Sequence, residues 1–453
     1  MKLNRVRFLL IFSFSIIMAL QTSLLSSANE YTVIPSDLVA ESAVLINQSS
    51  GQIIFDKNAN TPMYPASTTK VLTAIIILED LPLDEVVTID AASPYAGGSA
   101  IALEPGETLT VEQLLYALMI TSANDAAEAL AIHHSGSIEA FAAVMNERAA
   151  EMGAVNSNFE NPHGLPNPNH LTTAYDLALI AQHAMKNEVF RNIVQTRRYE
   201  IPPTNMKSET RYLNSTNSFY QGIEGSNDLI SIRGVNVPIA YEYVTGIKRG
   251  YTDEAMNCLI SSATKDDKSY ISVVLKSNGN SMYADSRLLL DYGLFGVQSY
   301  ELLAKGVVVE NVNLNNKRKT VIPLVLEQTL SVDLTDGVDP TLLEKKINIE
   351  STIDLPVLKG EVLGTISYYY GETQVASAKL VSQDDFAGED LVNSVTTFFA
   401  TEKRPLFSKS WFIYVVTRLF LAVLLWRTIM TFLRLQKRKK KKAKRTQNRV
   451  TLS

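Results

Sequence analysis

The chain has 453 residues, of which 46% are hydrophobic and 20% charged, an ordinary balance for a globular protein of two or three domains. Its single cysteine, Cys258, excludes an intramolecular disulfide. The acidic residues all lie between Glu30 and Glu402, so the body between the two basic ends carries a net charge of about −20, which argues against nucleic-acid binding by that body.

The N-terminus has the layout of a secretory signal. Three basic residues precede an apolar run near residues 8–20, and small residues ending in "SSA" follow, so we expect cleavage after Ala28. An uncleaved N-terminal anchor is the alternative. Either form predicts that the body is exported to the extracytoplasmic face of a membrane.

The first part of the body mixes strand and helix patterns. Residues 42–60 hold two β-rich runs around a Ser-Ser-Gly turn, which predicts a hairpin. Residues 110–134 begin with a Thr/Gln pair at capping-box spacing and continue as an apolar helix, and residues 173–186 repeat the device with Thr and Asp. A strand over residues 268–277 and a helix over residues 281–295 follow. This order predicts an α/β or α+β domain with strands at both ends.

The chain changes character after about Leu302, where short β-rich runs separated by turns predict a small all-β domain. In this stretch "PVLKGEVLGTI" is similar to the turn of carrier domains that present a modified lysine. The Met-Lys-Met signature of such turns is missing, so Lys359 is interpreted as an ordinary turn residue.

The C-terminus predicts a membrane anchor. Residues 411–433 are long enough to span a bilayer, although Arg418 and Arg427 interrupt them. These arginines are nine residues apart, on opposite faces of a helix, which favours a span with snorkelling arginines over an in-plane helix. Arg418 alternatively marks a shorter span. The ten Lys and Arg that follow predict a cytoplasmic tail, nucleic-acid binding by this run being the less economical interpretation. The expected segments are a signal peptide (1–28), the α/β domain (31–300), the β domain (303–385), a linker (386–410), the membrane helix (411–433) and the tail (434–453).

Ser67 and Lys70 stand three residues apart in "YPASTTKVLTAIIIL", directly before an apolar run. Serine is a favoured helix N-cap, and a lysine one turn later is common on any helix, so this spacing alone does not indicate a catalytic pair. Because the run Val71–Leu78 is apolar almost throughout, however, this lysine is expected near the interior, where burial lowers the pKa of its amine and lets it accept a proton from serine. The same spacing at Ser262 and Lys265 lies in a hydrophilic stretch and is interpreted as coincidence.

Two further stretches hold candidate site residues. In "TSAND", Ser122 and Asn124 are expected in the middle of an apolar helix, where polar groups need partners. In "GIKRGYTDEAMNCLISSA", Lys248 and Gly250 are expected on one strand, the glycine allowing a substrate backbone to approach closely. Cys258 follows in a β-rich run and is predicted to be a buried structural thiol.

In this order "STTK", "SAN" and "KRG" resemble the S-x-x-K, S-x-N and K-T-G signatures of the serine acyl-transferases that penicillin blocks. The stretches "GSAIALEPGETLTVEQLLYALMITSANDAAEALA" and "ENPHGLPNPNHLTTAYDLALIAQHAM" narrow the resemblance to the D-alanyl-D-alanine carboxypeptidases, the low-molecular-mass penicillin-binding proteins. The resemblance covers most of residues 37–296. It implies a transpeptidase domain of the penicillin-binding and β-lactamase-like fold, and the β domain and C-terminal anchor fit the same architecture.

The resemblance implies an enzyme that removes the terminal D-alanine from peptidoglycan stem peptides, with β-lactam antibiotics as acylating inhibitors and with neither metal nor organic cofactor. Catalysis would fall to Ser67 as nucleophile, Lys70 as its base and Ser122 as proton relay. Substrate binding would fall to Asn124, Lys248, Arg249, Gly250 and Tyr251, with the N–H groups of Ser67 and Tyr251 as oxyanion hole.

The sequence departs from the family where Arg249 replaces the threonine of K-T-G, where Met256 replaces a frequent glycine, and in a long stretch over residues 218–240 that is expected near the cleft. Arg249 could bind the substrate carboxylate as a bidentate fork or fill the space that the substrate needs. Two alternatives therefore stay open: a β-lactamase-like hydrolase, and a wall-binding protein whose site has weakened.

Overall fold

The structure is a computed structural model that describes residues 31–220, 228–314, 319–335, 338–387 and Arg427. An antiparallel sheet of five strands organises the first part, in the order β2-β1-β11-β10-β9. Its strands are β1 (Ser42–Asn47), β2 (Ile53–Lys57), β9 (Val244–Thr252), β10 (Met256–Lys265) and β11 (Lys268–Ser277). The predicted hairpin is confirmed as β1–β2, and β9 is an edge strand.

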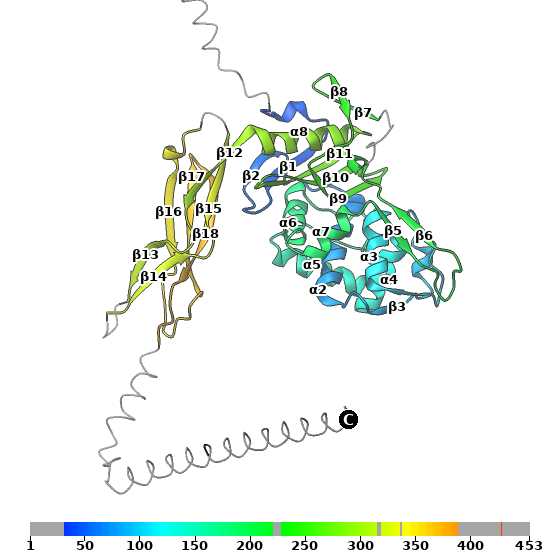
Figure 1. Cartoon of the computed structure of the whole chain (residues 1–453), viewed down its shortest axis with the longest axis horizontal. Coiled ribbons are helices and arrows are strands. Elements are labelled where there is room, and N and C mark those ends of the chain that lie inside the picture. Colours follow the sequence, from blue (N-terminus) through cyan, green and yellow to red (C-terminus); the bar gives the residue numbers. More distant parts are fainter. Residues whose placement is uncertain (1–30, 221–227, 315–318, 336–337, 388–426, 428–453) are drawn as a thin grey trace, which may run out of the picture. The chain divides into compact units, whose positions relative to one another are not determined.

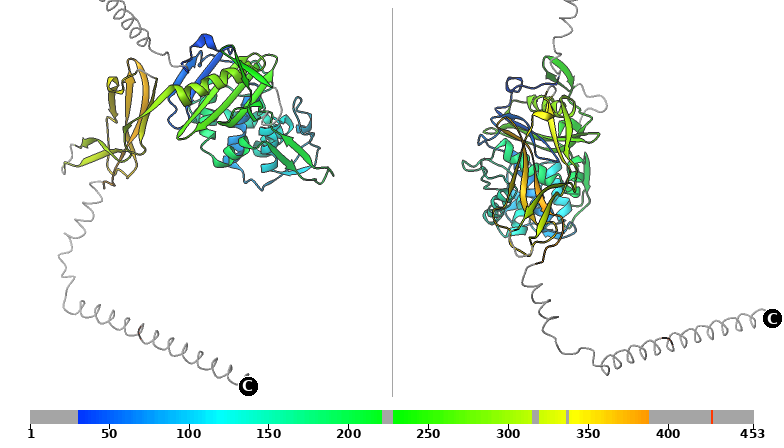
Figure 2. Two further views of the ribbon diagram at one scale, coloured as in Figure 1. Left: turned by 45° about the horizontal axis from the view of Figure 1, so that its top comes forward. Right: turned by 90° about the vertical axis from the view of Figure 1, so that its left-hand side faces the viewer.

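The sheet is buried on both faces because its apolar residues alternate between two cores. Leu45 and Leu259 pack with residues of α8 (Ser281–Gly296), whereas Val44 and Ile260 pack on the other side with the remaining helices. Figures 1 and 2 show α8 lying across one face of the sheet, with the other helices beyond the opposite face. Those helices are α2 (Lys70–Asp80), α3 (Val111–Ile120), α4 (Asn124–Ser135), α5 (Ile138–Glu151), α6 (Ala174–Ala184) and α7 (Glu188–Gln195).

Helix caps follow the sequence with one exception. Thr110 and Gln113 form the predicted capping box at α3, with Gln113 N–H donating to Thr110 Oγ1 over 3.2 Å and Thr110 N–H donating to Gln113 Oε1 over 2.9 Å. Thr173 caps α6 by accepting from Asp176 N–H. The carboxylate of Asp176 does not complete a box there, because it accepts from Asn156 N–H and Ser157 Oγ instead.

The expectation that Ser122 and Asn124 lie in the middle of one helix is wrong. Helix α3 ends at Ile120, Ser122 adopts a left-handed φ of 64°, and α4 begins only at Asn124. Short polar side chains compete with helical backbone hydrogen bonds, and here the chain breaks rather than bury them in a continuous helix. The break places both side chains at a helix junction.

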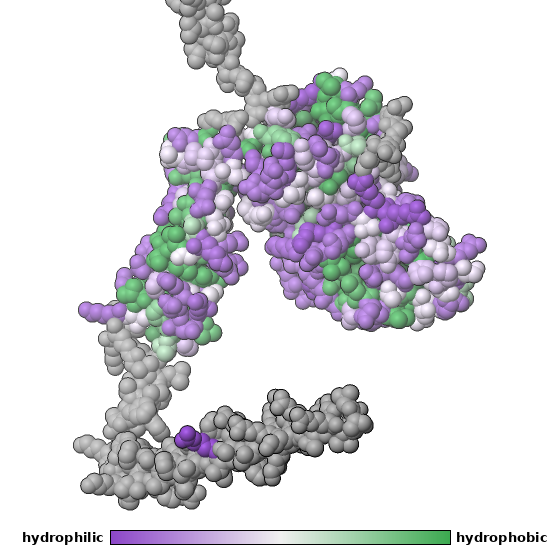
Figure 3. All heavy atoms as spheres, viewed as in Figure 1, coloured by the Kyte–Doolittle hydropathy of each residue, from purple (hydrophilic) through white to green (hydrophobic). Residues whose placement is uncertain are grey.

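The long stretch before the third motif forms its own hairpin in the part that the structure describes. Strands β7 (Leu229–Ile232) and β8 (Val235–Pro238) pair with each other, and β7 packs beside α8. Leu229 and Val235 leave hydrophobic surface exposed over this hairpin, visible in Figure 3. The hairpin therefore lies on the α8 face of the sheet and does not edge the cleft, contrary to the expectation for residues 218–240. Residues 221–227 of that stretch lie outside the described residues.

The C-terminal part is all-β, as predicted. A sheet runs in the order β13-β14-β18-β17-β16, and β12 pairs with β15. The strands are β12 (Val297–Leu303), β13 (Val308–Asn313), β14 (Val321–Leu326), β15 (Leu330–Thr335), β16 (Glu344–Ile349), β17 (Val362–Tyr370) and β18 (Thr373–Ser382).

The predicted signal and tail, nearly all of the linker, and the membrane helix apart from Arg427 lie outside the described residues. Within the residues that are described, none of the helices has the length and hydrophobicity to cross a bilayer.

Candidate active site

The first motif forms a tight turn at the start of α2. Ser67 lies in the 3-10 turn Ala66–Thr69, and Lys70 opens the helix. Ala66 takes a left-handed φ of 49°, which is unusual for a residue with a Cβ. Strand β9 passes so close that a Cβ on Gly250 would lie 2.6 Å from the backbone nitrogen of Ser67. Glycine is therefore required at position 250 for the close approach of β9 to this turn, whereas the expectation from the sequence was that the glycine serves the approach of a substrate backbone.

The amine of Lys70 lies in the interior, within hydrogen-bond distance of three oxygens. Its Nζ is 3.0 Å from Ser67 Oγ, 2.6 Å from Asn124 Oδ1 and 2.8 Å from the carbonyl oxygen of His163. Lys70 is 0% exposed, and burial, aided by the like charge of Lys248, holds the pKa of its amine well below the usual range. The site thus pairs a serine with a lysine that is biased toward its neutral form.

The second motif joins this pair through Asn124. The Asn124 amide accepts from Lys70 and donates from Nδ2 to the carbonyl of Gly97 over 2.7 Å, so the asparagine bridges α2 to the loop before α3. Ser122, almost buried, stands two residues earlier at the helix junction. The next residue, Asp125, was not identified from the sequence. Its buried carboxylate accepts hydrogen bonds from backbone N–H groups of that loop, and its negative charge acts to raise the pKa of Lys70, against the effect of burial.

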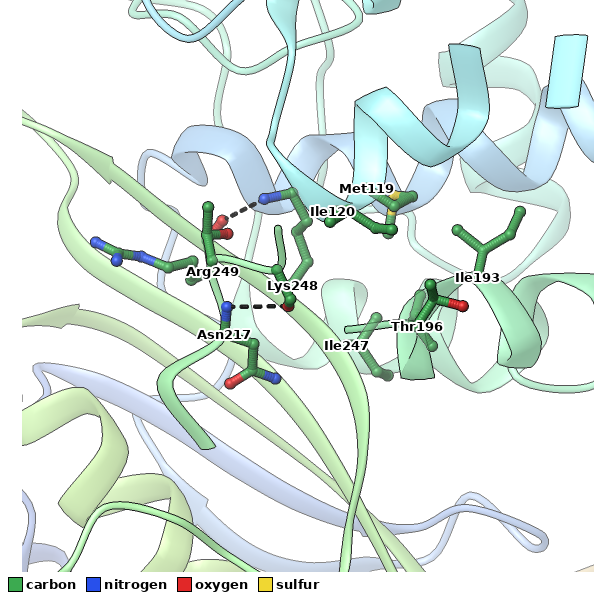
Figure 4. A pocket seen from close by; sticks show the side chains of 11 residues that line it. Met119, Ile120, Ile193, Thr196, Asn217, Ile247, Lys248 and Arg249 are labelled. Carbon is green, nitrogen blue, oxygen red and sulfur yellow. Dashed lines mark hydrogen bonds between the residues drawn. The ribbon is translucent and has the colours of Figure 1, made fainter. Parts of the chain in front are cut away.

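The third motif lies on edge strand β9. Lys248 is 1% exposed and donates to the carbonyl of Arg249 over 2.9 Å. Burial and the neighbouring Arg249 charge lower the pKa of Lys248 to about 7. In Figure 4 the Lys248 side chain runs alongside a small cavity, while the Arg249 guanidinium points away from it. Tyr251 exposes its ring and donates its hydroxyl to Asp253.

That cavity has a volume of only about 10 Å³, enough for a single water molecule and far too small for a peptide. Ser215 and Asn217, a second pair with the S-x-N spacing, line it together with Lys248. The second Ser-x-x-Lys pair, Ser262 and Lys265, does not form a site like that of Ser67 and Lys70. Ser262 is buried on β10 against Thr245, and Lys265 pairs with exposed Asp266.

Two histidines that the sequence left without a role border the site. The stretch "NPHGLP" brings the His163 carbonyl to Lys70, and the His163 ring lies 3.0 Å from Glu128. A Cβ on Gly164 would lie 1.8 Å from the carbonyl oxygen of Ala66, so this loop is in direct contact with the turn that holds Ser67. His170 lies on the same side, 3.0 Å from Thr69 Oγ1. The sequence signal that could have identified the His163 loop is the His-Gly pair between two prolines.

The comparisons with known proteins agree with this arrangement. The D-alanyl-D-alanine carboxypeptidase family matches residues 29–279, more than half of the chain. This chain belongs to that family. It is a serine-type D-Ala-D-Ala carboxypeptidase, and the penicillin-binding protein 5 C-terminal domain matches residues 298–387, where the all-β part lies.

Relatives of the carboxypeptidase cover most of its length. The D-alanyl-D-alanine carboxypeptidase DacF of Bacillus subtilis is 32% identical over 353 residues, covering 76% of this chain and 85% of its own. A DD-transpeptidase of Streptomyces K15 has a TM-score of 0.51 at 31% identity, covering 57% of this chain and 98% of its own. Penicillin-binding protein 5 of Haemophilus influenzae, with a TM-score of 0.62 at 24% identity, covers 79% of this chain and all of its own and shares the fold.

Proposed function

We propose that Ser67 is the nucleophile of this carboxypeptidase and Lys70 its general base. Ser67 Oγ attacks the carbonyl carbon between the two terminal D-alanines of a stem peptide and passes its proton to Lys70 Nζ. The C–N bond then breaks, the leaving amine takes the proton held by Lys70 through Ser122, which returns Lys70 to its neutral form, and the terminal D-alanine departs. Water hydrolyses the resulting ester, which releases the trimmed peptide and restores the serine hydroxyl.

The observation that carries this assignment is the set of oxygens around Lys70. A neutral amine has two N–H groups and one lone pair. The Asn124 amide oxygen and the His163 carbonyl can only accept, so they take the two N–H groups. The lone pair is then left for the hydroxyl of Ser67, 3.0 Å away. Asn124 thereby orients the base, and its remaining hydrogen-bonding capacity is available to the peptide.

We assign binding of the substrate strand to edge strand β9. An edge strand offers unpaired backbone groups to an extended peptide, and Gly250 lets this strand lie directly beside the turn that holds Ser67. The N–H groups of Ser67 and Tyr251 are proposed to stabilise the developing oxyanion. The charges of Lys248 and Arg249 favour the carboxylate of the terminal D-alanine.

The assignment is tested by incubating the purified protein with a fluorescent penicillin and mapping the labelled peptide by mass spectrometry. A long-lived adduct on Ser67 supports the proposed carboxypeptidase chemistry. Rapid turnover of the penicillin would instead support the β-lactamase-like alternative. Folded protein without any adduct would support the alternative of a weakened, wall-binding site.

Substituting Arg249→Thr is expected to weaken binding of substrates that end in a free carboxylate. A charged hydrogen bond contributes about 1.5–3 kcal/mol, so kcat/KM for D-Ala release should fall about tenfold or more, mainly through KM. The control is a matched peptide ending in D-alaninamide, for which the loss should vanish. A rise in rate for the carboxylate substrate would show that Arg249 obstructs the site.

Deprotonation of the Lys248 amine is expected to limit the activity of the enzyme at alkaline pH. The proposed role needs its protonated form, whose pKa is lowered to about 7, so kcat/KM should fall as the pH rises through neutrality. Removing the neighbouring charge in Arg249→Thr raises that pKa and should shift the alkaline limb of the pH–rate profile upward. A profile that stays unchanged would contradict this role of Lys248.

We also propose that the enzyme is exported and held at the membrane by residues 411–433, with the basic tail in the cytoplasm. The support is the sequence of the two ends. Removing residues 411–453 should release active enzyme from the membrane fraction. Retention of the truncated protein on membranes would exclude this anchor.

A further inference from the structure

Behind the nucleophile, a chain of hydrogen bonds connects the strained turn at Ala66 to His170. Thr69 Oγ1 donates to the carbonyl oxygen of Ala66 over 2.9 Å, and His170 Nε2 lies 3.0 Å from the same Oγ1. At the far end, Glu160 N–H donates to His170 Nδ1 over 3.1 Å. The side chains of Thr69 and His170 are both buried.

The contacts determine the direction of this chain. Because Nδ1 of His170 accepts a hydrogen bond, the proton of a neutral ring must be on Nε2. Burial lowers the pKa of His170 to about 3, so the ring is neutral at physiological pH. Nε2–H therefore donates to Thr69 Oγ1, whose own proton is already given to Ala66. Phe159 fixes the ring plane through a T-shaped contact at 5.5 Å.

We propose that His170 is a positioning residue for the acylation step, acting through Thr69 on the turn that presents Ser67. A left-handed residue with a Cβ costs about 1–2 kcal/mol and persists only where its surroundings enforce it. Here the Ala66 carbonyl, next to the peptide N–H of Ser67, is held by Thr69 on one side and by close contact with Gly164 on the other. Releasing it lets the turn relax and moves both Ser67 Oγ and the Ser67 N–H.

The inference rests on Ser67 being the nucleophile, and its test uses side chains that copy one end of the imidazole. Glutamine places an amide nitrogen near the position of Nε2 and can still donate to Thr69. Asparagine copies only Nδ1 and cannot reach Thr69. Thr69→Val removes the hydroxyl with little change of shape, whereas Thr69→Ser keeps it. Each variant is studied as the full chain, with its melting temperature measured alongside.

We expect His170→Asn and Thr69→Val each to slow acylation of Ser67 by fluorescent penicillin about a hundredfold, with KM for the stem peptide changed far less. His170→Gln and Thr69→Ser should restore most of the rate. In the double variant His170→Asn/Thr69→Val the loss should equal that of one single variant, because both break the same chain. A merely structural role would instead track the melting temperature.

Two results would overturn the inference: wild-type acylation in a folded His170→Asn or Thr69→Val variant, or losses that simply add in the double variant. If His170→Asn does not fold, the Thr69 pair decides by itself. Failure of the proposed function is recognised separately, since the wild-type enzyme would then give no adduct on Ser67.

Discussion

Ser67→Ala is expected to abolish the penicillin adduct and D-alanine release while the fold is retained. Alanine removes the atom that forms the acyl bond, and losing a serine nucleophile lowers kcat on the order of 10⁴-fold or more. The hydroxyl is only partly buried at the start of α2 and caps no helix, so the melting temperature should change little. Intact-protein mass spectrometry after incubation with penicillin measures the adduct directly.

The matched control is Ser262→Ala, which removes the serine of the second Ser-x-x-Lys pair. Ser262 is buried on β10, where its hydroxyl contacts Thr245 rather than a lysine. Labelling should persist in this variant. If Ser67→Ala still formed a stable adduct or released D-alanine, the assignment of the nucleophile would be wrong.

Gly164→Ala is expected to disturb the active site through the loop that packs against the Ser67 turn. Position 164 has a φ of 86°, and an added Cβ would lie 1.8 Å from the carbonyl oxygen of Ala66. No rotation of a methyl group relieves that overlap, so the turn holding Ser67 or the loop carrying His163 must move. We expect acylation to fall about a hundredfold and the free energy of unfolding to fall by about 2 kcal/mol or more.

Gly136→Ala separates the overlap from the cost of the backbone conformation. Gly136 follows α4 with a φ of 81°, and a Cβ there would meet no atom within 4 Å. The Gly136→Ala variant should therefore be less stable by about 1 kcal/mol, while its acylation rate stays unchanged. Chemical denaturation and acylation kinetics of the two variants give the comparison. Equal effects in both would contradict the close contact at Gly164.

The sequence predicted the elements with strong local patterns. The capping box at Thr110 is a contact between near neighbours, and hydrophobic periodicity determines which residues of β10 and β11 are buried, so both could be inferred without tertiary information. The break between α3 and α4 was missed because the apolar residues on either side keep helical spacing, and spacing alone does not reveal a left-handed residue at Ser122.

The sequence by itself determined the family, the residue types of the site and the order in which its three motifs appear along the chain. Only the tertiary structure decided what surrounds them. That Lys70 faces an asparagine 54 positions away and a backbone carbonyl 93 positions away is a long-range contact, and no local pattern encodes it. The same holds for His170, 101 positions from Thr69. Because burial and partners set both the pKa of a side chain and its direction, the chemistry of these residues exists only in the folded chain.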